Sequence, residues 1–117
     1  MSENEIADFN KNELWIIQKT LEERYRRTVE TQFADSELRL DPHATTLTLC
    51  PAIFWSDGSA NFVVTKVGES RFRCQFFYRV HQQFGTGIET YDDLAECMVS
   101  LLQVQADYAA KLNESVK

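Results

Sequence analysis

The stretch RFRCQFFYRVHQQF, residues 71–84, decides the fold, because its side chains alternate strictly between two faces. Alternation with a period of two is typical of a strand in a half-buried sheet. We therefore predict one strand over residues 71–84. Its inward face carries Phe72, Cys74, Phe76, Tyr78 and Val80. Its outward face carries Arg71, Arg73, Gln75, Phe77, Arg79 and His81.

Two earlier stretches predict neighbouring strands. Residues 62–67 are mostly apolar and follow Asp57 and Gly58, a pair typical of tight hairpins. Residues 45–55 are rich in β-branched and aromatic side chains, but they include Pro51, which cannot donate to a strand ladder. We expect a three-stranded antiparallel meander in which the strand with Pro51 lies at the edge and has a bulge near that proline.

Amphipathic helices are predicted on both sides of the strands. In residues 13–33, apolar side chains recur every three or four positions, as in a helix that packs against a core. They are Leu14, Ile17, Leu21, Tyr25, Val29 and Phe33. Residues 91–112 show a second stripe, and Thr90 with Asp93 is typical of a capping pair at its start. The predicted fold class is α+β, in the order α-β-β-β-α, with the meander packed against both helices.

The length of the chain favours a single domain. A chain of 117 residues can bury enough apolar surface to fold without disulfides or metals. We predict one α+β domain over residues 13–117, preceded by a polar lead-in over residues 1–12, whose large apolar side chains are Ile6 and Phe9. No internal repeat or low-complexity linker indicates a second domain.

The charge and composition of the chain indicate its cellular environment and the kinds of partner that it could bind. The net charge is −6, and acids outnumber bases before residue 42 and after residue 88, while bases outnumber acids between them. Net negative charge repels phosphate backbones and anionic membranes. No apolar run is long enough to cross a membrane and the first residues are acidic, so we expect a cytoplasmic protein. Three widely spaced cysteines favour reduced, mostly buried thiols.

The outward face of residues 71–84 is the best candidate for a recognition surface. Arginines around an aromatic side chain can bind a phosphate, a base or an acidic peptide. The alternative is an ordinary solvated sheet face, with Phe77 covered by a neighbour. That face would be open if both helices packed on the other side of the sheet.

Other motifs favour structural roles. Gly85 and Gly87 lie between a strand and a helix, but the motif lacks the remaining residues of either phosphate-binding fingerprint. Cys74 and His81 lie on opposite strand faces, and no spacing of cysteines and histidines resembles a zinc site. We therefore predict no metal, no cofactor and no catalytic residue.

The order of one helix, three strands and one helix resembles that of the double-stranded RNA-binding domain. In that family the last helix opens with lysines that contact phosphates. Residues 90–96 of this chain read TYDDLAE, with acids in place of those lysines. The resemblance therefore covers element order, and RNA binding does not follow from it.

These observations rank three hypotheses. The first is a non-enzymatic protein-binding module, of an adaptor, chaperone-like or regulatory kind, which the sequence also allows to form a homodimer. It rests on the number of large aromatic side chains, which exceeds what a small core needs. Consecutive apolar residues cannot all point into one core, so some apolar surface is left over for a partner. Its contact residues would be Trp15, Phe54, Trp55 and Phe77. The second is a nucleic-acid-binding module that uses Arg71, Arg73, Phe77, Arg79 and His81, and the third is a small enzyme of unknown reaction.

Overall fold

The computed structural model describes residues 6–39, 43, 45–78 and 83–116, with side chains up to residue 111. It confirms the α+β class, with one sheet and two helices. In chain order the elements are α1 (Lys11–Tyr25), β1 (Gln32–Leu38), β2 (Thr48–Asp57), β3 (Ala60–Gly68), β4 (Arg71–Phe77), β5 (Gln83–Phe84) and α2 (Leu94–Val116).

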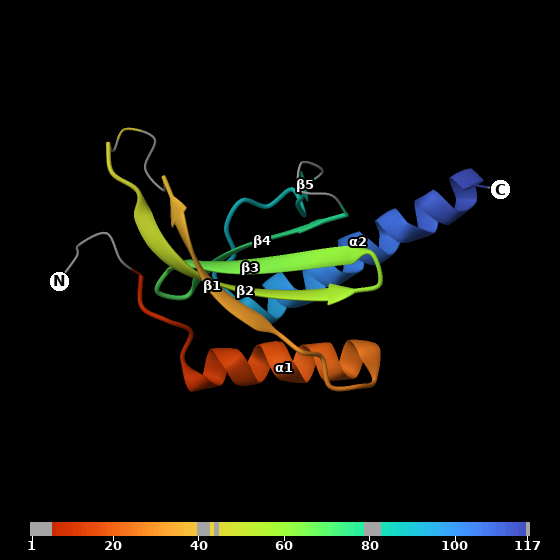
Figure 1. Cartoon of the computed structure of the whole chain (residues 1–117), viewed down its shortest axis with the longest axis horizontal. Helices are drawn as coiled ribbons and strands as arrows, with labels where there is room; N and C mark the ends of the chain where they lie inside the picture. Colours follow the sequence, from red (N-terminus) through yellow and green to blue (C-terminus); the bar gives the residue numbers. More distant parts are fainter. Residues whose placement is uncertain (1–5, 40–42, 44, 79–82, 117) are drawn as a thin grey trace.

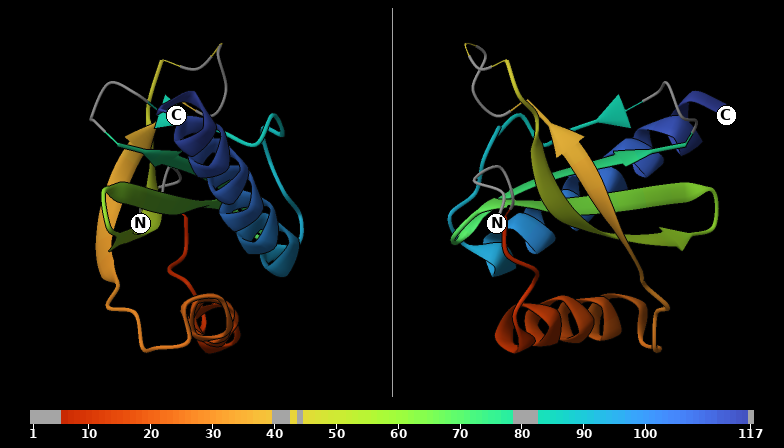
Figure 2. Two further views of the ribbon diagram at one scale, coloured as in Figure 1. Left: turned by 90° about the vertical axis from the view of Figure 1, so that its right-hand side faces the viewer. Right: turned by 60° about the vertical axis from the view of Figure 1, so that its left-hand side comes forward.

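The sheet is an antiparallel meander of five strands in the order β1-β2-β3-β4-β5. Both helices lie on the same side of it, and the other side faces the viewer in Figure 1. Figure 2 shows α2 crossing behind the sheet and α1 below it. The predicted hairpin is confirmed, because Asp57 pairs with Ala60 around Gly58, which has a φ of 61°. The prediction of three strands was wrong, since β1 and β5 were not anticipated.

Strand β1 replaces the last part of the helix predicted over residues 13–33. Helix α1 ends at Tyr25, and Arg26 adopts a left-handed φ of 60° while its N–H bonds to the Glu22 carbonyl at 2.8 Å. Thr28, Val29 and Thr31 follow, and β-branched side chains favour extended backbone. Val29 packs in the core from the segment that joins α1 to β1, so its helical spacing from Tyr25 did not indicate a helical backbone at this position.

Strand β2 is not at the edge of the sheet, because it lies between β1 and β3. Its pairing with β1 runs in continuous register past Pro51, which lies opposite Asp35, so the predicted bulge there was wrong. Pairing with β3 begins at Ala52, one residue later, so this proline interrupts no β2–β3 pair. The register shift lies instead between Lys66 and Gly68 in β3.

The strand predicted over residues 71–84 is two strands. Its alternation is confirmed in β4, where Phe72 and Phe76 are buried and Arg71 is exposed. The chain then returns as β5, and Phe84 pairs with Phe76. Val80, Arg79 and His81 lie outside the described residues.

Helix α2 begins later than predicted. The Asp93 carboxylate accepts hydrogen bonds from the N–H groups of Ala95 at 2.9 Å and Glu96 at 3.4 Å, so Asp93 caps the helix. The capping role predicted for Thr90 was wrong. Tyr91 exchanges two backbone hydrogen bonds with Phe72 and so extends the sheet beside β4.

The core lies between the sheet and both helices, and aromatic rings fill much of it. The Trp55 and Phe62 rings stack with centroids 5.2 Å apart. Phe9, from the stretch predicted as a polar lead-in, is buried and stacks on Phe72 at 6.5 Å. Within the described part of the chain, neither helix combines the length and apolarity needed to span a membrane.

Candidate functional site

The basic face of β4 carries less free charge than the sequence indicated. Arg71 is exposed, but Arg73 is only 33% exposed and its Nη2 lies 3.4 Å from the Glu89 carboxylate. Gln75 and Phe77 are half-buried, and Arg79 and His81 lie outside the described residues. Neither α1 nor α2 covers this face (Figure 2), but Leu38 at the end of β1 lies over part of it.

That closure leaves a hollow of about 150 Å³ on the β3–β4 surface. It is lined by Leu38, Val63, Thr65, Arg73, Cys74 and Gln75. The curled β1–β2 pair therefore covers part of the face that we had assigned to recognition. Arg71 and the paired Arg73 are the two basic side chains that the described part of β4 contributes.

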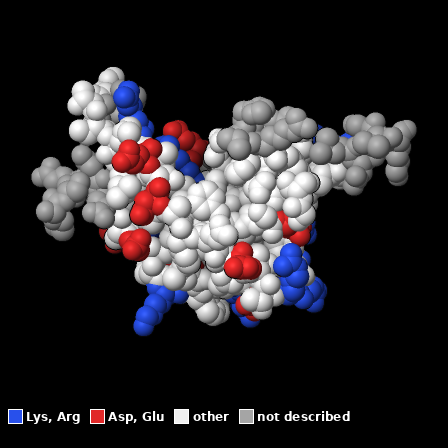
Figure 3. Space-filling view, in the orientation of Figure 1, with Lys and Arg blue, Asp and Glu red and all other residues white. Residues whose placement is uncertain are grey.

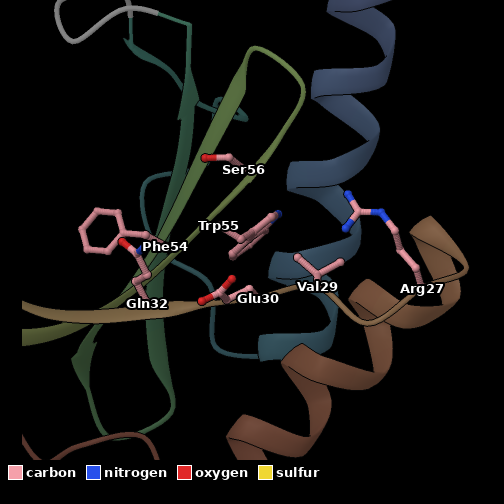
Figure 4. A pocket seen from close by; sticks show the side chains of 7 residues that line it. All are labelled: Arg27, Val29, Glu30, Gln32, Phe54, Trp55 and Ser56. Atoms are coloured by element: carbon pink, nitrogen blue, oxygen red, sulfur yellow. The ribbon is translucent and has the colours of Figure 1, made fainter.

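The predicted aromatic contacts divide between surface and core. Trp15, on α1, is 62% exposed. Trp55 is 3% exposed and packs on Phe62, so we exclude it from the candidate surface. Phe54 is half-buried on the other face of β2, and Figure 4 shows its ring pointing away from the Trp55 indole.

Strand β1 adds a surface that the sequence did not indicate. It is the first strand of the sheet, so one of its edges has no neighbouring strand among the described residues. Each of its residues is exposed or half-exposed. Phe33 is paired opposite the buried Ile53, yet it is 62% exposed because neither helix covers it. A strand edge of this kind presents unpaired N–H and C=O groups to solvent.

A side-chain hydrogen bond joins α1 to the start of β1, near Trp15 and Phe33 in the sequence. The Gln18 side chain donates a hydrogen bond to the Thr31 hydroxyl at 3.2 Å, which ties α1 to the start of β1. Trp15 lies one turn before Gln18, and Phe33 lies two residues after Thr31 on the same strand face.

Carboxylates accompany these exposed aromatics. Asp35 and Glu37 share the strand face of Phe33, Glu30 precedes the strand, and Asp8 lies in the segment before α1; all four are exposed. None of them has an ion-pair partner in the described part of the chain. Figure 3 shows acidic side chains over the side of the molecule where β1 runs, and a largely uncharged middle.

Two hollows flank β1. One, of about 160 Å³, is lined by Asp8, Phe33, Ala34, Asp35, Pro51 and Ala52. The other, of about 290 Å³, is lined by Arg27, Val29, Glu30, Gln32, Phe54, Trp55 and Ser56 (Figure 4). Arg27 in the larger hollow is paired with Asp57 at 3.4 Å, so its charge is partly compensated. The two hollows give β1 an apolar and acidic border.

Two buried polar atoms lie near the larger hollow. The Tyr25 hydroxyl and the Trp55 Nε1 have no hydrogen-bond partner among the described residues. Burial raises the pKa of Tyr25, and the nearby Trp55 indole opposes that shift without reaching hydrogen-bond geometry.

Among the described residues, the three thiols and His43 are not gathered at one place in the fold. Cys74 and Cys97 face each other between β4 and α2, and their contact lowers the pKa of Cys74 and raises that of Cys97. His43 lies in an exposed turn, and His81 is outside the described residues. Across the residues that the structure describes, no three histidine, cysteine or acidic side chains cluster as metal ligands would.

Comparison of the chain with protein-family models, with curated proteins and with solved structures finds no match. Any function must therefore be argued from the residues of this chain.

Proposed function

We propose that this chain is a non-enzymatic protein-binding module that acts in the cytoplasm as an adaptor, chaperone-like or regulatory protein. The observation that carries the proposal is the exposed edge of β1, together with Phe33 and Trp15, each 62% exposed. Exposed aromatics beside an unpaired strand edge are typical of protein-interaction surfaces, because both gain by excluding water. We name this surface, comprising β1, Trp15 and the exposed acids Asp8 and Glu30, the β1 surface.

Nucleic-acid binding is less well supported. Its candidate surface offers Arg71 and an Arg73 already paired with Glu89, while the carboxylates of the β1 surface have no ion-pair partner among the described residues. Phosphate binding requires several uncompensated cations, and its affinity falls steeply with salt. The described part of the predicted strand face supplies two basic side chains, Arg71 and Arg73, which is too few for such a role.

A photo-cross-linking amino acid placed at position 33 tests the proposal. The matched control carries the same amino acid at position 99, because Val99 is 59% exposed but lies on α2. After irradiation in lysate of the source organism, at two salt concentrations and both with and without nuclease, we expect a discrete protein adduct from position 33 and not from position 99. A cross-link between two copies of the chain would instead support the predicted homodimer.

Equal labelling from both positions, or labelling that disappears with nuclease, would contradict the proposal. The first result would indicate nonspecific contact with exposed apolar groups. The second would transfer the function to nucleic acid.

A further inference from the structure

We infer that the β1 edge accepts an extended, basic segment of a different protein as a sixth strand of the sheet. This inference rests on the proposed function and specifies the chemistry of the partner. The backbone of β1 suits strand addition, the side chains that border β1 suit a basic segment, and the charges of β1 disfavour a second copy of this chain.

The backbone of β1 is suited to strand addition. It runs for seven residues as QFADSEL, without proline, lysine or a bulge, so the features that protect this edge from pairing are the charges of Asp35 and Glu37, which would not oppose a basic strand. Its pairing with β2 is continuous from Gln32 to Leu38 and leaves the outer N–H and C=O groups of alternate residues available. An added strand would gain main-chain hydrogen bonds along this length, as in other cases of strand addition.

The side chains determine which segment fits. In the smaller hollow, Phe33 and Pro51 provide apolar walls, and Asp8 and Asp35 provide carboxylates. A lysine or arginine can lie with its aliphatic stem against the apolar walls and its charged head near the carboxylates. Glu30 and Glu37 extend the acidic border along β1, so basic residues at alternate positions of the added strand would be favoured.

The same charges disfavour a second copy of this chain as the occupant. An antiparallel pair of β1 strands centred on Asp35 would place Asp35 opposite its counterpart and Glu37 opposite the partner's Phe33. Like charges directly opposite each other destabilise a strand pair. Each copy also has a net charge of −6. The carboxylates therefore oppose self-pairing in that register, the net charge opposes association of two copies in any register, and both favour a basic strand.

The test uses three labelled nonapeptides and fluorescence anisotropy at low and moderate salt. The probe alternates lysine and valine, its first control alternates glutamate and valine, and its second is the lysine peptide with N-methyl groups at alternate residues. We expect binding by the lysine peptide alone, because N-methylation keeps the charge but removes backbone donors. Hydrogen exchange should also slow in residues 32–38 when that peptide binds.

Charge variants supply the matched controls. Asp35→Asn with Glu37→Gln should weaken binding of the lysine peptide by about five- to tenfold, since two surface charge pairs are lost. Asp35→Lys with Glu37→Lys should transfer binding to the glutamate peptide. Circular dichroism of each variant verifies that the fold is retained.

The outcomes separate this inference from the proposed function. Equal binding of the N-methylated and unmodified peptides would overturn strand addition, because charge alone would then explain the affinity. Failure of every peptide to bind, with a protein adduct still obtained from position 33, would overturn the basic-strand inference and leave the protein-binding function intact. A dimer in light scattering that is abolished by Phe33→Asp would overturn it in favour of a second copy.

Discussion

Replacing Lys66 by methionine is expected to destabilise the fold strongly. Lys66 Nζ lies 2.9 Å from Glu13 Oε1 and 3.0 Å from the Asp8 carbonyl oxygen, and the two charged side chains are 7% and 10% exposed. The same Glu13 oxygen accepts the Asn10 N–H at 2.8 Å, which completes the capping box of α1. Lys66 therefore ties β3 to the start of α1 and to the segment before it.

The magnitude follows from the burial of this pair. Removing one partner leaves a charge in the interior without compensation, which costs about 3–5 kcal/mol. A domain of this size is stabilised by only about 5–15 kcal/mol in total. Methionine keeps most of the aliphatic stem of Lys66, so little of the expected loss comes from packing. In the double variant Lys66→Met with Glu13→Gln, both charges are removed while an oxygen remains for the Asn10 N–H, so most of the loss should be recovered.

Urea unfolding followed by circular dichroism measures these free energies. The control is Lys19→Met, because Lys19 and Glu23 form a pair at 4.0 Å whose side chains are 55% and 70% exposed. That variant should change the free energy of unfolding by less than about 0.5 kcal/mol. A cost for Lys66→Met no larger than that of the control, or a double variant no more stable than the single one, would refute the reasoning.

Three further predictions concern the thiols and the cap of α2. In the folded protein, iodoacetamide should modify Cys74 first, because Cys74 is partly exposed and its contact with Cys97 lowers its pKa. Cys50 and Cys97 are fully buried and should react later. Mass spectrometry identifies the order of modification, and reaction at Cys97 before Cys74 would contradict the prediction. Burial raises the pKa of Cys50 above its usual 9.0, so this thiol ionises at a lower pH in the unfolded chain than in the folded one. As the pH rises above 9.0, the free energy of unfolding of the natural chain, measured with urea, should therefore fall relative to that of Cys50→Ala. A pH-independent difference in the free energy of unfolding between the two proteins would contradict this prediction. Asp93→Ala should lower the free energy of unfolding by about 1 kcal/mol in the same assay, since it removes the cap of α2. The matched variant Asp92→Ala, at an exposed neighbouring residue, should leave the free energy of unfolding almost unchanged. Equal effects of the two variants would mean that Asp93 is not the cap.

The strand and helix periodicities explain what could be predicted. In β4, alternation placed Phe72 and Phe76 inward, and in α1 the helical spacing placed Ile17 and Leu21 inward, as the structure confirms. These patterns are local, because each side chain's direction follows from its neighbours along the chain. The same rule misassigned Phe33, whose spacing from Val29 matches a helix although the backbone is already extended.

The candidate site could be predicted only in part. Trp15 is exposed as expected, whereas Trp55 lies in the core because the parity of β2 turns it inward with Ile53 and leaves Phe54 outside. Parity along β2 could have indicated this separation. No pattern in residues 32–38 indicated a strand, since nearly all its side chains are exposed and it lacks an apolar alternation.

The sequence by itself determined the α+β class, the Asp57–Gly58 hairpin, the inward face of β4 and the excess of acids, because propensity, periodicity and charge are properties of short stretches. Only the tertiary structure decided that β1 exists, that it forms an edge, and that its carboxylates stand beside Phe33. The physical reason is that β1 depends on backbone pairing with β2, whose paired residues lie ten or more positions away in the sequence, and such nonlocal hydrogen bonds leave little trace in side-chain patterns.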